Sequence, residues 1–280
     1  MNEPLSIKVG DVAFPFHWNG TEKTRNSALN ILKGSTYPLL KGVNPRVIFD
    51  IGSNIGAASI HFALNYPEAT VYSFEPASIN FSLLRSNASH HKNIKVFQNG
   101  IYDEVKTERI WVNAQNPERN SLSDHWAGSA SYEEIQLIRL DEFLSENKIE
   151  KIDIFKIDTE GCELKILQTI AKYLSVIDGL YLEYHSETDK RAILELLRLN
   201  HDIVIDRPVG VESRYVDESL LDDFWNYKEI KVGDKLIVNA QEILTAKHVQ
   251  TLRDRGILNI KVWTKGMGEL ICKKKASSSN

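Results

Sequence analysis

The chain of 280 residues is predicted to adopt an α/β fold with a doubly wound sheet. Three observations lead to this prediction. Short apolar runs alternate with stretches of helical pattern from residue 46 to residue 206. Within these runs apolar residues do not alternate with polar ones, which is typical of strands buried on both faces of a parallel sheet. The first run ends in an acid and is followed by glycines, where open α/β sheets bind ligands.

Composition narrows the class of protein further. Lys and Arg number 34 and Asp and Glu number 38, so the net charge is −4 and a basic nucleic-acid binder is not indicated. The hydrophobic fraction of 42% and the charged fraction of 26% are those of a globular protein. Two cysteines build neither a disulfide framework nor a four-cysteine zinc site, and a reducing compartment fits them. Because no membrane span or secretion signal is visible, we expect a cytoplasmic protein.

The elements follow in order along the chain. Residues 1–40 form a lead segment with an expected strand at Ser6–Val9 and a helix near Arg25–Leu32. The expected strands of the α/β region are Arg46–Asp50, Thr70–Phe74, Ile94–Gln98, Glu108–Val112, Glu134–Arg139, Ile152–Ile157, Gly179–Tyr184 and His201–Asp206. The expected helices are Ala57–Asn65, Ser78–Asn87, Leu140–Glu146, Cys162–Leu174 and Lys190–Leu199. Right-handed crossovers would place the strand C-termini along one edge of the sheet.

The rhythm breaks after residue 210. A charged, loop-rich stretch leads to a strand at Leu236–Asn239, a helix at Ala246–Arg255 and a strand at Asn259–Trp263. One more strand is expected at Glu269–Lys273, and the last residues form a solvated tail.

Asp50 to Gly56, with the sequence DIGSNIG, opens the first helix. Gly52 allows a sharp turn and close approach of a ligand, and Gly56 allows close packing where the helix begins. The spacing is neither that of a dinucleotide-binding loop nor that of a Walker A loop. A plain strand–turn–helix connection is the alternative to ligand binding.

Glu75, followed by Pro76, ends the next predicted strand. It lies 23 residues beyond Gly52, close to the offset expected of an acid that binds ribose hydroxyls. A carboxylate can accept hydrogen bonds from both vicinal hydroxyls. Together with the glycine turn, Glu75 predicts a nucleoside site, and a solvent-facing acid at a strand end is the alternative.

The segment DIFKIDTEGCE, residues 153–163, gathers ionisable groups at one strand end. Lys156 and Asp158 share a face of the strand because side chains alternate. Ionisable groups at such an edge are candidates for acid–base catalysis. The alternative is structural, with Lys156 paired to a carboxylate and Glu160 at a helix N-terminus.

These motifs together resemble the FkbM family of S-adenosylmethionine-dependent methyltransferases. The matching segments are VIFDIGSNIG (47–56), YSFEPASIN (72–80), FQNGIYDE (97–104), IRLDEFL (138–144), IDIFKIDTEGCELKIL (152–167) and LYLEYH (180–185). The resemblance implies a class I methyltransferase fold, Rossmann-like, with seven strands, the last one antiparallel, and S-adenosylmethionine as cofactor. It also implies O-methylation of a sugar, glycan or natural-product hydroxyl by in-line displacement.

The resemblance also implies roles for individual residues. The methionine end of the cofactor would be lined by Asp50, Gly52, Ser53, Asn54 and Gly56. Glu75 and Pro76 would lie at the ribose, and Gly100 and Ile101 near adenine. Asp158 would face the amino-acid portion of the cofactor or the substrate hydroxyl.

A base would help because a sugar hydroxyl is a weak nucleophile. The candidates for catalysis are Asp158, His185 and Lys156, and a histidine suits a base because it titrates near neutrality. Asp158, Glu160, Glu183 and His185 could approach one another, but no spacing in the sequence demands a metal, and none is predicted.

Residues 41–210 and 264–275 then form the expected methyltransferase core. Residues 211–263 are an inserted cap or interaction segment, with a homo-oligomer or partner contact as one use, and residues 276–280 are a flexible tail. The first rival function is an NAD-dependent oxidoreductase, disfavoured because Asn54 stands where that loop needs glycine. The second is a non-catalytic nucleoside-binding module, which would need the cofactor residues to have decayed.

Overall fold

A computed structural model of the chain describes residues 3–9, 12–19, 21–113, 120–122, 131–208, 211–213, 224–225, 230–232, 235–238, 246–254, 262–264 and 268–276. The expected solvated tail therefore lies mostly outside the described residues. Among the described residues, no helix has the length and apolar character needed to cross a bilayer.

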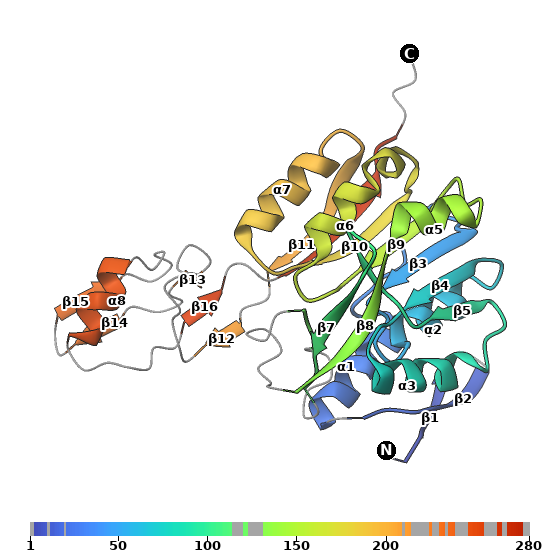
Figure 1. Ribbon diagram of the computed structural model, residues 1–280, viewed down its shortest axis with the longest axis horizontal. Helices are drawn as coiled ribbons and strands as arrows, with labels where there is room; N and C mark the ends of the chain where they lie inside the picture. Colours follow the sequence, from blue (N-terminus) through green and yellow to red (C-terminus); the bar gives the residue numbers. More distant parts are fainter. Residues whose placement is uncertain are drawn as a thin grey trace.

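A seven-stranded sheet forms the centre of the molecule, in the order β11-β17-β10-β9-β3-β4-β5 (Figure 1). Its strands are β3 (Val47–Ile51), β4 (Thr70–Phe74), β5 (Ile94–Phe97), β9 (Ile154–Ile157), β10 (Gly179–Tyr184), β11 (His201–Pro208) and β17 (Gly268–Lys274). Only β17 runs antiparallel to its neighbours, and it separates β10 from β11. The predicted sheet of seven strands with its last strand antiparallel is therefore confirmed. Dinucleotide-binding sheets are mostly parallel, so the antiparallel β17 between β10 and β11 is a further argument against the oxidoreductase.

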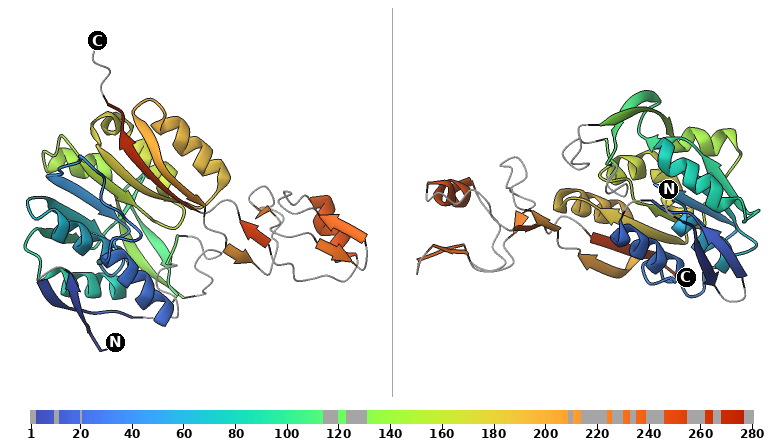
Figure 2. Two further views of the ribbon diagram at one scale, coloured as in Figure 1. Left: turned by 180° about the vertical axis from the view of Figure 1, so that it is seen from behind. Right: turned by 90° about the horizontal axis from the view of Figure 1, so that it is seen from below.

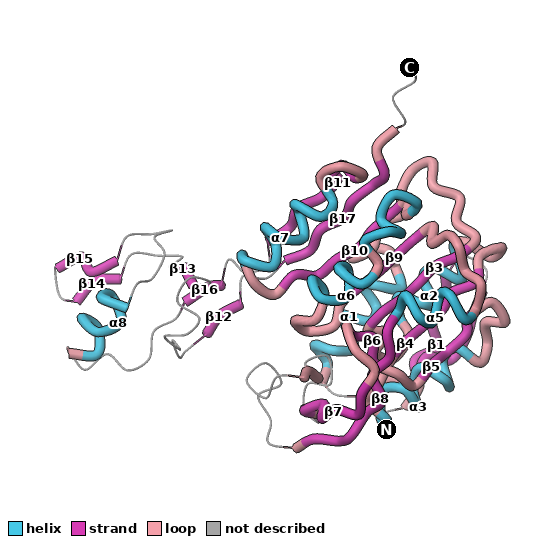
Figure 3. The backbone as a smooth tube through the Cα atoms, turned by 45° about the horizontal axis from the view of Figure 1, so that its top comes forward, coloured by secondary structure: helices cyan, strands magenta, loops and turns pink. Residues whose placement is uncertain are grey.

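Helices cover both faces of this sheet, as Figure 3 also shows. On one face α1 (Glu22–Leu32), α2 (Ala57–Asn65) and α3 (Ser78–Ala88) pack around Ile60 and Leu83. On the other face lie α5 (Leu140–Glu146), α6 (Glu163–Thr169) and α7 (Glu187–Leu197). Since both faces are covered, the strands are apolar on both sides, which explains their continuous apolar runs.

Aromatic rings cross the sheet beneath one layer of helices. Phe49 stacks on Tyr72 with ring centroids 4.9 Å apart, and Phe74 stacks on Phe97 at 4.8 Å. Phe143 of α5 meets Phe74 edge-on at 5.0 Å. Stacked and edge-on pairs are both favourable arrangements of aromatic rings. This packing fixes strands β3, β4 and β5 relative to one another behind the strand ends.

Smaller elements surround the core. The N-terminal strands β1 (Leu5–Val9) and β2 (Val12–Phe16) form a hairpin, of which the sequence predicted only the first strand. Pro15 obscures the second strand, and proline is tolerated in a strand at an edge. A three-stranded sheet consists of β6 (Gly100–Tyr102), β7 (Lys106–Trp111) and β8 (Tyr132–Arg139).

Two helix boundaries differ from the prediction. The expected helix at 162–174 divides into α6 and a 3₁₀ helix at Ala171–Val176, because α6 ends at Ile170. Helix α7 begins earlier than expected, since the hydroxyl of Ser186 accepts a hydrogen bond from the Asp189 N–H and caps the helix.

The segment between β11 and β17 carries its own elements, drawn to one side of the sheet in Figures 1 and 2. They are β12 (Val211–Ser213), β13 (Phe224–Trp225), β14 (Ile230–Val232), β15 (Lys235–Val238), α8 (Ala246–Arg253) and β16 (Val262–Thr264). β12 and β13 pair with β16, and β14 pairs with β15. Pro208 at the end of β11 lies opposite Gly268 at the start of β17, so the segment leaves and re-enters the sheet at one point.

Candidate functional site

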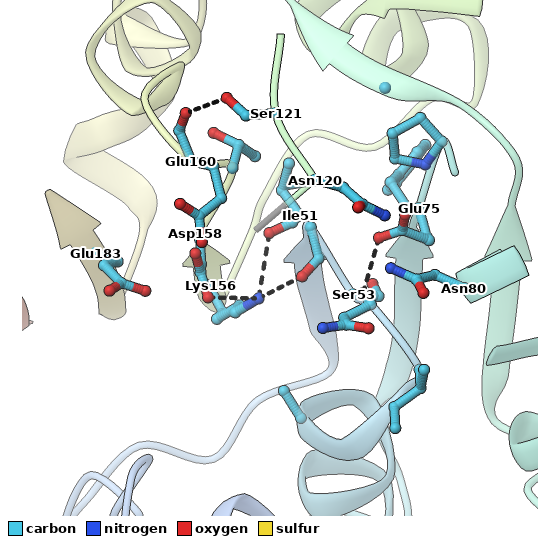
Figure 4. A pocket seen from close by; sticks show the side chains of 18 of the residues that line it. Ile51, Ser53, Glu75, Asn80, Asn120, Ser121, Lys156, Asp158, Glu160 and Glu183 are labelled. Atoms are coloured by element: carbon cyan, nitrogen blue, oxygen red, sulfur yellow. Dashed lines mark hydrogen bonds and ion pairs between the residues drawn. The ribbon is translucent and has the colours of Figure 1, made fainter. Parts of the chain in front are cut away.

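A cavity of about 520 Å³ lies at the carboxyl ends of β3, β4, β9 and β10. This volume is in the range of small-molecule and cofactor sites. Figure 4 shows Glu75 and Asn80 on one side of it and Asp158, Glu160 and Glu183 on the other. The N-terminal lead segment also contributes to the lining, with residues Asn19, Thr24, Ser27, Ala28, Ile31, Thr36 and Tyr37.

The turn after β3 forms the floor of the cavity. Gly52 has a φ of +74°, and a Cβ there would run into the backbone carbonyl of Asp158. The N–H groups of Gly52 and Ser53 both donate to the carbonyl of Phe74, at 3.1 and 2.9 Å. Asn54 has a φ of 49° and lines the cavity beside them. The turn is therefore bound to the end of β4 and brings backbone close to a ligand.

Lys156 stabilises this turn from behind. Its ammonium lies 3.1 Å from Oδ1 of Asp50 and donates to the carbonyl of Gly52 at 2.7 Å. Burial lowers the pKa of Lys156, but the charges of Asp50 and Asp158 outweigh burial and raise it. Ser59 donates to the second oxygen of Asp50 at 2.6 Å. Lys156 is thus a charged, fixed group that positions the turn, and this disfavours it as a proton acceptor.

Glu75 is buried at the end of β4 and lines the cavity. Its Oε2 accepts from the Asn54 N–H at 2.9 Å, and its Oε1 accepts from the Ala77 N–H at 2.9 Å. Each carboxylate oxygen has a second lone pair, so two acceptor positions remain for a ligand with two hydroxyls. Burial raises the pKa of Glu75 to about 7, against the lowering effect of the two N–H groups.

The opposite side of the cavity carries four carboxyl groups, which we name the acidic wall. They are Asp158, Glu160, Glu183 and Glu269. Glu269 of β17 is in register with Glu183 of β10, so two segments far apart in the sequence meet there. Burial, and then the charge of Asp158, raises the pKa of Glu183 well above its usual range.

His185 lies behind the acidic wall with a side chain only 2% exposed. Its Nε2 is 3.3 Å from Glu160 and its Nδ1 is 3.3 Å from Glu163. Burial lowers the pKa of His185, but Glu163 and Glu160 outweigh burial and raise it well above the usual range. A protonated histidine cannot take a proton, which disfavours the expectation that His185 is the base.

Most of the residues expected at the site do line the cavity. They are Gly52, Ser53, Asn54, Glu75, Pro76, Gly100, Ile101, Lys156 and Asp158. Three do not. Asp50 is fully buried against Lys156, Gly56 packs toward Leu84 at the start of α2, and His185 lies behind the wall.

Several lining residues are not predicted by the sequence. Asn80 of α3 is one, although it lies in the matching segment YSFEPASIN. Asn120 and Ser121 follow a stretch without a clear pattern, and the hydroxyl of Ser121 donates to the carbonyl of Glu160 at 2.9 Å. Glu269 could have been found only by knowing which strand β17 pairs with.

The sheet order and the glycine turn define a class I methyltransferase fold. The profile of the family described as "Methyltransferase FkbM domain" matches residues 50–204, which is more than half of the chain. The chain belongs to this family, as the sequence motifs predicted. Enzymes of this family use S-adenosylmethionine as methyl donor.

Several curated relatives are similar over part of the chain. The 2-O-methyltransferase NoeI of Sinorhizobium fredii is 28% identical over 62% of this chain and 79% of its own length. The 31-O-demethyl-FK506 methyltransferase FkbM of Streptomyces tacrolimicus is 27% identical over 43% of this chain and 58% of its own. The hexuronic acid methyltransferase AglP of Haloferax volcanii is 26% identical over 54% and 61%. For FkbM and AglP, the chain thus spans about three fifths of the relative's length.

A solved structure described as methyltransferase FkbM from Methylobacillus flagellatus matches with a TM-score of 0.42 and 17% identity. The match covers 60% of this chain and 42% of that one.

Proposed function

We propose that the chain transfers a methyl group from S-adenosylmethionine to a hydroxyl of a sugar, glycan or natural product. One observation carries this proposal. In a chain of the FkbM family, a single cavity has a buried carboxylate suited to a ribose at one side and a wall of carboxylates at the other. The names of NoeI, AglP and FkbM describe O-methylation or a hexuronic acid substrate, which supports this class of acceptor.

The residues present fit the proposed cofactor. The two remaining acceptor positions on Glu75 match the two hydroxyls of a ribose. The turn at Gly52 has no space for a Cβ, which would meet the carbonyl of Asp158, so backbone alone lines this part of the cavity. The acidic wall would stabilise the positive sulfonium electrostatically. When bound, the cofactor supplies a methyl group that is already activated by that sulfonium.

The chain's own contribution is then to hold the acceptor and receive its proton. Asp158 faces the cavity from the end of β9 and can accept a hydrogen bond from an acceptor hydroxyl. A carboxylate of the wall would receive the hydroxyl proton when the acceptor is methylated. Fixing the oxygen in line with the S–CH3 bond supplies much of the rate enhancement in such reactions.

Calorimetry and methyl transfer test the proposal. S-adenosylhomocysteine should bind the purified chain and NAD should not. Radiolabelled S-adenosylmethionine should label hydroxyl groups of glycosides or hydroxylated natural products. If S-adenosylhomocysteine does not bind, the proposal fails.

We further propose that residues 211–263 cap the acceptor side or contact a partner. The segment leaves the sheet at Pro208 and returns at Gly268, at the same strand-end edge as the cavity. Since these two residues lie opposite each other, a short Gly-Asn turn can replace 209–267 without moving either strand. A cap predicts that this deletion keeps the affinity for S-adenosylhomocysteine and lowers methyl transfer. Unchanged transfer would remove the cap role.

A further inference from the structure

Two side chains of the acidic wall lie close to the histidine behind it. Asp158, Glu183 and His185 each offer a ligand atom, and these atoms all lie within 4.8 Å of one another. Asp158 follows β9, while Glu183 and His185 lie at the end of β10, and the two strands pair in parallel. Divalent cations bind oxygen ligands at about 2.0–2.6 Å, so ligands on opposite sides of a cation are separated by roughly 4–5 Å. The cluster therefore has the size of a cation site.

The orientation of His185 is a second, independent observation. Its Nδ1 faces Glu163, and Glu163 is itself held by the Thr159 N–H at 2.7 Å and the Thr159 hydroxyl at 3.0 Å. Histidines that bind metals usually donate their second ring N–H to a carboxylate, which fixes the ring and the tautomer. Binding of a cation would release the proton from Nε2, which lies 3.3 Å from Glu160 on the side away from Glu163.

The charges around the cluster also favour a cation. Asp158, Glu160 and Glu183 lie together at this end of the cavity. Lys156 is 3.9 Å from Asp158, but it is closer to Asp50 at 3.1 Å and donates to the glycine turn. The protonated ring of His185 offsets part of this negative charge, and a divalent cation bound among the carboxylates would take over that role.

We propose that Asp158, Glu183 and His185 bind a divalent cation, with Glu160 beside Nε2 as a fourth ligand. Two or three carboxylates with one imidazole suit Mn²⁺, since carboxylates favour the harder cations and imidazole the first-row metals. Cation binding goes beyond the proposed methyl transfer and does not require it. A carboxylate that binds through one oxygen keeps the other for an acceptor hydroxyl, so the cation and the role of Asp158 are compatible.

Manganese binding to the full chain tests the site directly. Metal-stripped protein is titrated with Mn²⁺, and bound Mn²⁺ is followed by electron paramagnetic resonance. Glu183→Gln and His185→Gln should each weaken Mn²⁺ binding at least tenfold. Glu68→Gln is the control, because Glu68 is exposed and pairs with Arg46 away from the cavity, and the Mn²⁺ affinity of this variant should stay within twofold.

Two further readouts make every outcome decisive. The affinity for S-adenosylhomocysteine, measured on the same samples, reports on the cofactor site alone. Failure of the proposed methyltransferase function and failure of cation binding can therefore be distinguished. If a variant fails to fold, wild-type Mn²⁺ should still show hyperfine coupling to an imidazole nitrogen. Absence of Mn²⁺ binding to wild type, absence of that coupling, or unchanged affinity in folded Glu183→Gln and His185→Gln would overturn the proposal.

Discussion

Glu75 should make cofactor binding depend on pH, because its buried carboxyl is largely protonated below neutrality. The pKa rises from 4.5 to about 7 on burial, and at 1.36 kcal/mol per pKa unit this corresponds to roughly 3 kcal/mol. Both carboxyl oxygens of Glu75 are free to accept hydrogen bonds from two ribose hydroxyls only when the carboxyl is deprotonated. Binding therefore has to displace the proton when the pH is below about 7.

The sign of the effect follows from this proton. Affinity for S-adenosylhomocysteine should increase about tenfold between pH 5.5 and pH 7 and then level off. Stability of the free protein should show the opposite trend from this group. A carboxyl whose folded pKa is raised stabilises the fold at low pH, and that contribution is lost as the pH rises from 4.5 through about 7.

Calorimetry in two buffers of different ionisation enthalpy gives both affinity and the number of protons released. Glu75→Gln is the matched control, because it keeps the shape and cannot titrate. Its affinity should be lower by about 1–3 kcal/mol at pH 8, since its amide NH₂ would face a backbone N–H. The affinity of this variant for S-adenosylhomocysteine should also stay constant between pH 5.5 and pH 8. A wild-type affinity that does not change with pH, or an equal slope in Glu75→Gln, would refute the reasoning.

Three further predictions concern the glycine turn, the buried ion pair and the two cysteines. Gly52→Ala should abolish S-adenosylhomocysteine binding because the added Cβ meets a backbone carbonyl. Gly161→Ala, also at positive φ but in open space, should lower the free energy of unfolding in urea by about 1–2 kcal/mol and keep binding. Equal effects of the two variants on binding would contradict the role of the turn at Gly52. Lys156→Met should lower the free energy of unfolding by about 3–5 kcal/mol because it leaves Asp50 buried without its partner. Adding Asp50→Asn should restore part of this stability, and a decrease below about 1 kcal/mol in Lys156→Met would contradict the stabilising role of the ion pair. Burial raises the pKa of the Cys162 and Cys272 thiols to about 12, so Ellman's reagent should label neither thiol in the native protein and both in guanidinium. Rapid labelling of the native protein would contradict the burial of these thiols.

The sequence was most informative where local chemistry and position coincide. Gly52 and Glu75 were predicted because a sharp turn and an acid at a fixed offset are visible along the chain, and both line the cavity. The doubly wound sheet was predicted because apolar runs without alternation indicate strands buried on both faces, whereas its seven strands, the last one antiparallel, were implied by the resemblance to the FkbM family. The second strand of the N-terminal hairpin was missed because Pro15 interrupts its pattern.

Other features depend on contacts between distant segments. Asp50 was expected at the ligand, but Lys156 from another strand reaches it first and binds it behind the turn. His185 was a reasonable base by residue type, yet two carboxylates around it raise its pKa, and neither contact is visible in the spacing of the chain. Glu269 contributes to the acidic wall only because β17 pairs antiparallel with β10.

The position of β17 has a consequence for how the protein is made. During synthesis, β10 leaves the ribosome about 80 residues, and β11 about 60 residues, before β17, the strand that pairs with both of them. Until residues 268–274 emerge, β10 has an open edge, which is a common starting point for aggregation. The nucleotide side of the molecule, built from β3, β4 and β9, is complete well before that time. A nascent chain could therefore already hold the cofactor while its acceptor side is still unassembled.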